Sequence, residues 1–201
     1  MASLEQITTL AHGEDVPALL ACCEAFELDL GHTTLAPDMS RGVYKVHLVV
    51  YFLCQQLDNA RFLWKRLPVE ARDPELNALW EIGKALWVSD AAAAQAAMVA
   101  HVWSPPLVSG LVTRLQREHL QRSFRQFAKA YSIISGEALA KALGVPVATV
   151  HEMANAANWT TDAESGAYVP VVPEEPPGKP ALLEQLSVLT DFVSHIEKEV
   201  K

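Results

Sequence analysis

The 201-residue sequence has few cysteines and no excess of positive charge, and both shortages exclude classes of protein. Its three cysteines, the adjacent Cys22 and Cys23 and the distant Cys54, form neither an even set nor a C-x-x-C spacing. This argues against a disulfide framework and against a thiolate zinc site, and it favours a reducing compartment. The net charge of −8 argues against general binding to nucleic acid or anionic lipid, because both reward a basic surface.

Catalytic and cofactor motifs are also missing. No two of the seven histidines lie two to four residues apart, the spacing that places paired metal ligands on one element. There is no phosphate-binding glycine loop and no nucleophile elbow, and the adjacent His151 and Glu152 are more typical of a surface than of a catalytic pair. We therefore predict a chain that is not an enzyme and that has no cofactor, no metal site and no small-molecule substrate.

Signals for secretion or membrane insertion are absent as well. The first residues lack a basic region followed by an apolar one, and the most apolar run, Val43 to Cys54, contains a lysine and a histidine and is too short to cross a bilayer. We expect a soluble intracellular protein that makes no contact with membranes.

The sequence does contain enough apolar residues for a folded core. Half of its residues are hydrophobic and a fifth are charged, which is typical of globular chains. Up to about Tyr131 the pattern predicts one amphipathic helix after another and no strand. The predicted helices are Val16–Phe26, Arg41–Leu57, Asn59–Leu67 capped by Asp58, Pro74–Val88 capped by Asp73, and a long helix that starts after Ser104, Pro105 and Pro106.

Several of these helices have distinctive faces. The helix Arg41–Leu57 should bury Val43, Val46, Val50, Leu53 and Leu57, which recur every three or four residues. Trp80 and Trp87 share a face, which suits helix packing or, as the less favoured alternative, a ligand box. The run Ala91–Ala97 has little side-chain volume, so a neighbouring helix can approach closely there.

The long helix has an apolar and a basic side. Leu120, Phe124, Phe127 and Tyr131 fall on one side. The opposite side carries a basic stripe, consisting of Arg114, Arg122, Arg125 and Lys129. The stripe is consistent with an ordinary solvated face, with docking to an acidic partner protein, or with RNA binding.

Residues 135–172 predict a winged helix. Ser135 can cap a helix that ends at Gly144, Pro146 can open a second helix, and two β-like segments follow around a polar turn. The module contains one lysine and four acidic residues, and its second helix has no Lys or Arg, so reading DNA is disfavoured. We predict assembly with another protein, with the outer strand of the wing, through Tyr168, Val169 and Val171, adding to a neighbour's sheet.

The last residues predict a partner-binding helix. A proline-rich linker, 173–180, precedes residues 181–201, in which apolar residues alternate spacings of four and three. We call this set the C-terminal seam: Leu182, Leu186, Leu189, Val193, Ile196 and Val200. An isolated helix of this length is marginal in water, so the seam should be buried against other subunits or, alternatively, against the chain's own body.

Five segments carry a resemblance to a known family: NARFLWKRLP (59–68), ALW (85–87), AYSIIS (130–135), ALGVPVATVHEMANAANW (142–159) and LTDFVSHIE (189–197). With them the chain resembles the PCI family, and within it the smallest PCI subunit, subunit eight, of the constitutive-photomorphogenesis signalosome. The run Ala91–Ala97 departs from that pattern, and residues 1–15 match nothing in it.

The resemblance implies a fold: a helical-repeat body (1–134), a winged helix with a small β-hairpin (135–172), a linker (173–180) and a C-terminal bundle helix (181–201). It also implies a non-catalytic scaffold that joins other PCI subunits of a complex that removes the ubiquitin-like Nedd modifier from cullins. With the resemblance we expect the nucleus and cytoplasm as its location. The alternatives are a PCI subunit of the proteasome lid or of translation initiation factor three, or an RNA-binding adaptor that uses the basic stripe.

Overall fold

The computed structural model describes residues 4–13, 15–30, 37–67, 72–104, 106–162, 166–172, 186 and 189–195. The chain divides into two units, Met1–Val171 and Val172–Lys201. We call the first the body and describe each unit by itself. In the described ranges no helix has both the length and the apolar character needed to cross a membrane.

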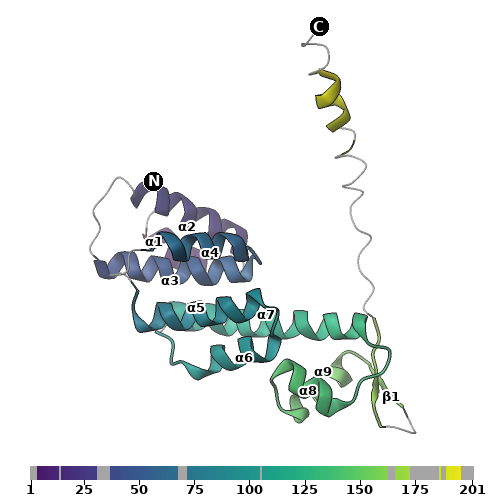
Figure 1. Cartoon of the computed structure of the whole chain (residues 1–201). Helices are drawn as coiled ribbons and strands as arrows, with labels where there is room; N and C mark the ends of the chain where they lie inside the picture. The colour runs from purple at the N-terminus through teal and green to yellow at the C-terminus, as the bar shows by residue number, and fades with distance from the viewer. Residues whose placement is uncertain are drawn as a thin grey trace. The chain divides into compact units, whose positions relative to one another are not determined.

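The body consists mainly of helices that stack in succession (Figure 1). The first seven are α1 (Leu4–Ala11), α2 (Val16–Leu30), α3 (Pro37–Leu53), α4 (Leu57–Arg66), α5 (Pro74–Trp87), α6 (Ala91–Ala100) and α7 (Leu107–Ala130). Helix α3 is central, because it packs against α2, α4, α5 and α7. The mostly helical architecture agrees with the all-helical body that the sequence predicts.

The larger of two core clusters lies among these helices. It is mainly aliphatic, and Leu48, Leu63, Leu79, Ile82 and Leu115 are among its fully buried members. On α3 the predicted face is confirmed for Val43, Val46, Val50 and Leu53, all of which are buried.

The boundary between α3 and α4 differs from the prediction. Helix α3 ends at Leu53, and Gln55 adopts a left-handed conformation with φ of 61°. Leu57 is therefore the first residue of α4 and not the last apolar residue of α3. The expected cap at Asp58 is wrong, because Gln56 is the N-cap residue and Asp58 lies in the first helical turn, where its charge favours the helix dipole.

The alanine run lets two helices approach closely, as predicted. Helix α6 packs against α8 (Gly136–Leu143), whose C-cap residue Gly144 has φ of 69°. A Cβ atom added at Gly144 would lie 2.9 Å from the Cα atom of Ala92, closer than packed atoms allow. Both the missing side chain at Gly144 and the small one at Ala92 are needed for this contact.

A second core cluster forms around the end of α7. Helices α8 and α9 (Val147–Ala156) pack against each other, and the predicted cap of α8 by Ser135 is confirmed. A two-stranded antiparallel sheet follows, with β1 (Thr160–Thr161) paired to β2 (Tyr168–Val169). Phe124 from α7 stacks on Trp159 with ring centroids 4.2 Å apart, so the aromatic side of α7 does form this core. Tyr131 does not join it, because α7 ends at Ala130 and Tyr131 is exposed.

In the second unit, residues 189–195 are helical. The linker 173–180 and the seam residues Leu182, Ile196 and Val200 lie outside the described residues.

Candidate protein-interaction site

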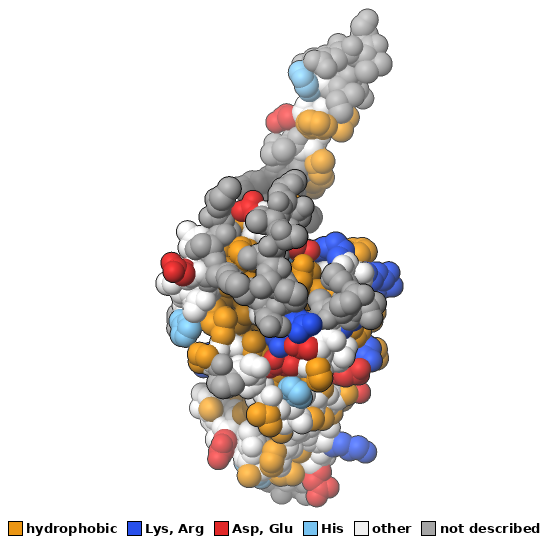
Figure 2. All heavy atoms as spheres, turned by 90° about the vertical axis from the view of Figure 1, so that its left-hand side faces the viewer, with side chains coloured by type: hydrophobic (Ala, Val, Ile, Leu, Met, Phe, Trp, Pro, Cys, Tyr) orange, Lys and Arg blue, Asp and Glu red, His pale blue; other side chains and the backbone are white. Residues whose placement is uncertain are grey.

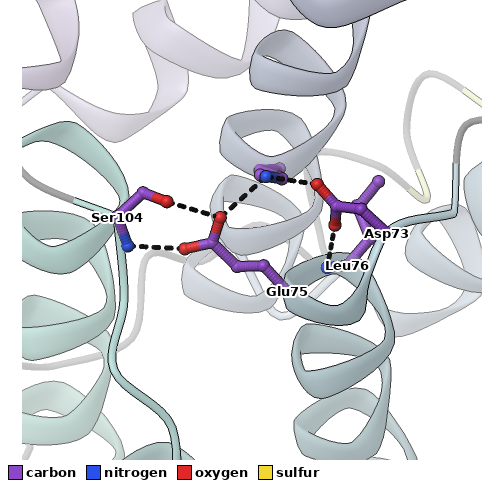
Figure 3. A network of polar contacts seen from close by, with 5 residues as sticks. Asp73, Glu75, Leu76 and Ser104 are labelled. Carbon is purple, nitrogen blue, oxygen red and sulfur yellow. Dashed lines mark hydrogen bonds and ion pairs between the residues drawn. The ribbon is translucent and has the colours of Figure 1, made fainter.

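A polar network fixes the start of α5 (Figure 3). Asp73 caps α5 by accepting the Leu76 N–H at 2.7 Å, which confirms the predicted cap, and it pairs with Lys45 of α3 at 2.5 Å. Lys45 also pairs with Glu75 at 2.7 Å, and Glu75 accepts the N–H and the hydroxyl of Ser104 at 2.6 and 2.7 Å. The network thus joins α3, α5 and the segment before α7, and it holds the helix that carries both candidate tryptophans.

The network keeps its charges although it is largely enclosed. Burial by itself would raise the pKa values of Asp73 and Glu75, but the hydrogen bonds from Lys45 and from backbone N–H groups outweigh it, and both pKa values are lowered. Burial alone would lower the pKa of Lys45, but the two carboxylates raise it. The three groups therefore stabilise one another as ions.

The two tryptophans of α5 have different environments. Trp80 stacks on Trp64 of α4, with ring centroids 5.1 Å apart and planes at 5°, so the packing interpretation is confirmed for this residue. Trp87 is not packed between helices in this way, because 48% of its surface is exposed. The guanidinium of Arg61 lies 5.5 Å from its ring centroid. Trp87 is available to a binding partner.

The basic stripe of α7 is not one surface. Arg114 donates to Glu118 at 2.8 Å and to the carbonyl oxygen of Gly13 at 3.1 Å, so its charge is engaged within the body. Arg122 is half-buried and lines a cavity, whereas Arg125 and Lys129 are exposed. On the face drawn in Figure 2, acidic, basic and apolar side chains are interspersed among the described residues. A docking role for the four residues stays a prediction.

The sheet differs from the expected wing edge at one position. Tyr168 pairs with Thr161 of β1 on one side and exchanges two backbone hydrogen bonds, 2.8 and 2.9 Å long, with Ile134 on the other. The expectation that Tyr168 belongs to an outer strand is therefore wrong, because both edges of the strand are used there. Its ring is also enclosed, and its hydroxyl forms a short hydrogen bond with His151.

The outward side of this sheet carries apolar side chains that we call the sheet face: Ile133, Val169 and Val171. Tyr168 and Ile134 are buried in the core, whereas Val169, the next residue of β2, is only partly buried. Ile133 is 53% exposed and Val171 is exposed to a similar extent. Sequence reasoning missed Ile133, although two successive isoleucines beside a helix end were a signal, since only one of them can face inward.

The described part of the C-terminal seam is exposed. Leu186, Leu189 and Val193 are all exposed, Leu189 by 60%, and their spacing of three and four places them on one side of a helix. Phe192, which sequence reasoning missed, is exposed as well. No described contact within the second unit covers these side chains.

Among the described residues, no group of three or more His, Cys, Asp and Glu side chains could hold a metal ion. The thiol of Cys23 is shielded from solvent. This burial, with smaller contributions from Cys22 and Glu24, raises the pKa of the thiol to about 12. A thiol with such a pKa is a poor nucleophile at neutral pH.

Comparisons with known proteins agree with one another. Residues 39–180 match the model of the CSN8/PSMD8/EIF3K family. The chain is 32% identical to the COP9 signalosome complex subunit 8 of Danio rerio, over 77% of this chain and 82% of the relative. It is 30% identical to that of Xenopus laevis, over 87% and 89%, and 34% identical to that of Arabidopsis thaliana, over 77% and 79%.

Proposed function

The chain belongs to the CSN8/PSMD8/EIF3K family, and from this premise we propose that it is a non-catalytic structural subunit of a COP9 signalosome. By the resemblance described above, that complex removes the ubiquitin-like Nedd modifier from cullins. The observation that carries the proposal is the similarity of most of the chain to relatives named as subunit 8 from two vertebrates and a plant.

The structure offers two apolar surfaces for assembly. In this proposal α8, α9 and the β1–β2 hairpin act as the winged helix that the sequence predicts, and their sheet face includes the exposed Ile133 and Val171 and the partly buried Val169. The seam presents Leu186, Leu189 and Val193. Fully burying an exposed side chain of this kind contributes about 1.5 to 3 kcal/mol before the cost of ordering. These side chains are already partly buried, so each contributes about half of that, and both surfaces favour association with neighbouring PCI subunits.

The alternatives have less support. The relatives cited above are named as signalosome subunits and not as subunits of the proteasome lid or of translation initiation factor three. An RNA adaptor would need a continuous basic surface, but Arg114 is engaged within the body and Arg122 is half-buried.

The seam can be tested by co-purification from cells. Leu186→Asp with Val193→Asp should release the chain from the complex, because the two carboxylates would have to be buried at the interface. His195→Asp is the matched control, since position 195 lies half a turn away from position 186 on the helix. Full recovery of partners with the double variant would refute a role for the seam.

The absence of catalysis is tested with the purified chain alone. We expect it to leave a neddylated cullin uncleaved, because no group of three or more His, Cys, Asp and Glu side chains in the described residues could hold the metal ion of a metal-dependent isopeptidase. Cleavage by the isolated chain would show that the assignment as a structural subunit is wrong.

A further inference from the structure

Two cavities of the body adjoin. The smaller has a volume of about 310 Å³ and lies among α3, α4 and α5. The larger, about 700 Å³, lies between the turn after α5 and helix α7. Leu57 and Val88 line both cavities. We call the pair the α5 groove.

The smaller cavity has an apolar interior. Phe52, Trp80 and Gly83 line it, and a Cβ atom added at Gly83 would lie 2.8 Å from the Phe52 ring. Trp87 and Val88 line it too, and they are 48% and 75% exposed. A concave apolar site with an exposed aromatic wall suits one bulky apolar side chain of a partner.

Positive charge surrounds this interior. Arg61 and Lys84 line the smaller cavity and Arg122 lines the larger one. Within the described ranges, no carboxylate forms an ion pair with Arg61, whose guanidinium lies over Trp87. Lys84 pairs with Glu81 at 2.7 Å, but both side chains are more than half exposed, and such surface pairs exchange readily for others.

Negative charge is scarce in the groove. Asp90 is the only carboxylate among the described residues that line either cavity, and it accepts the Ala93 N–H at 2.9 Å as the cap of α6. Because the whole chain has a net charge of −8, this is a local basic region on an acidic protein. Such a region attracts a short acidic segment but not a long polyanion, which the rest of the surface repels.

We propose that the α5 groove binds a short acidic segment of another protein. A bulky apolar side chain of the segment would occupy the smaller cavity, beside Trp87, and its carboxylates would pair with Arg61 and Arg122. The residues of the groove belong neither to the sheet face nor to the C-terminal seam. The groove is therefore a docking site in addition to the two surfaces on which the proposed function depends. An experiment can refute binding at the groove without refuting the proposed function, and the reverse.

The experiment uses the full chain labelled with ¹⁵N and a short synthetic peptide in which a Leu-Phe pair is flanked on both sides by Asp and Glu. Titration should shift the indole N–H signal of Trp87, assigned with Trp87→Phe. Replacing the acids by Asn and Gln, or the Leu-Phe pair by serines, should weaken binding by about tenfold or more, because each removes one half of the recognition.

Variants of the chain separate the groove from general charge attraction. Arg61→Glu should weaken binding of the acidic peptide by about tenfold. Arg125→Glu makes the same charge change at an exposed residue of α7 that lines neither cavity, and it should change the affinity by less than about twofold. Equal effects of the two variants, or no shift of the Trp87 signal at millimolar peptide, would overturn the proposal.

Two other occupants give different outcomes. If Leu186→Asp moves the Trp87 signal in the absence of peptide, the groove is occupied by the chain's own C-terminal segment. If single-stranded RNA displaces the peptide and binds in an Arg61-dependent manner, the ligand is a nucleic acid. Either result would refute binding of an acidic partner segment.

Discussion

The two core clusters of the body are stabilised in different ways. The larger one combines aliphatic packing with an enclosed network that links Lys45, Asp73, Glu75 and Ser104 from distant parts of the sequence. The smaller one is built around the stacked pair Phe124 and Trp159, and the sheet beside it leaves Ile133 and Val171 exposed. The comparison shows that the larger cluster adds an enclosed ion network to its apolar packing, whereas the smaller cluster depends for its largest contact on one stacked aromatic pair.

Phe124→Ala should have the largest effect, because the smaller cluster has few large side chains to compensate for the loss. The cavity and the lost stacking should lower the free energy of unfolding by about 3 to 5 kcal/mol, measured by urea denaturation. Phe192→Ala, at an exposed position of the second unit, should stay within about 0.5 kcal/mol of the parent. Similar losses in both variants would contradict the importance of the aromatic pair.

Lys45→Met tests the network of the larger cluster. It leaves Asp73 and Glu75 without their cation and should lower the free energy of unfolding by about 2 to 3 kcal/mol. This is less than the cost of removing one partner of a fully buried ion pair, because Asp73 is partly exposed. Lys65→Met, at an exposed position of α4, is the control.

The network also predicts an acid dependence. Because folding lowers the pKa values of Asp73 and Glu75, their contribution is present above the ordinary values of 3.8 and 4.5 and is lost as the pH falls through the lowered values. The parent should therefore lose more stability than Lys45→Met when the pH is decreased below about 4.5. Equal losses would indicate that the network does not stabilise the folded state.

His47 gives the larger cluster a second pH dependence in a different range. The ring is fully buried on α3, neither nitrogen has a hydrogen-bond partner in the described structure, and the Glu27 carboxylate lies 3.6 Å away. Burial, with a smaller contribution from Arg66, lowers the pKa of His47 from 6.5 to about 4. Between these two pKa values the unfolded chain therefore binds a proton at His47 that the folded protein does not bind.

Stability from His47 is thus complete above pH 6.5 and decreases as the pH falls toward 4. We expect a loss of about 2 kcal/mol between pH 7.5 and pH 5, measured by chemical denaturation. His47→Leu should remove most of this loss, with a smaller part left to His119, whose pKa burial also lowers. His12→Gln, at an exposed position, should retain the loss. A parent protein equally stable at both pH values would contradict the prediction.

Gly144→Ala tests the close contact between the end of α8 and α6, and of the changes at Phe124, Lys45, His47 and Gly144 it should have the smallest effect. The left-handed backbone and the 2.9 Å approach to Ala92 should together cost about 1 to 2 kcal/mol. Gly110→Ala on α7, where an added Cβ meets nothing within 4 Å, should instead stabilise the protein by about 0.5 to 1 kcal/mol. Thermal denaturation of both variants checks the opposite signs.

Much of the fold could be predicted where the signal is local. The caps at Asp73, Ser135 and Gly144 were correct because a cap depends on the residues within one helical turn. The end of α3 could not be predicted, since the apolar spacing continues through Leu57 and only the left-handed Gln55 interrupts it. The role of Tyr168 was missed because its pairing with Ile134 joins residues 34 positions apart.

The candidate sites show the same division. Exposed apolar seam positions followed from helical periodicity, and Leu186, Leu189 and Val193 are exposed as that pattern requires. The α5 groove could not be found in this way, because Arg61, Trp87 and Arg122 lie on three helices and have no common period in the sequence.

By itself, the sequence determined which segments become helices, where several of them begin and end, and that the chain is related to a family of complex subunits. Those features depend on neighbours in the chain and on composition. Only the tertiary structure decided that Lys45 meets two carboxylates, that Arg114 is engaged while Arg61 remains available, and that Trp80 packs while Trp87 reaches solvent. Burial and charge pairing depend on which helices pack together, and residues with identical local patterns therefore acquire different roles.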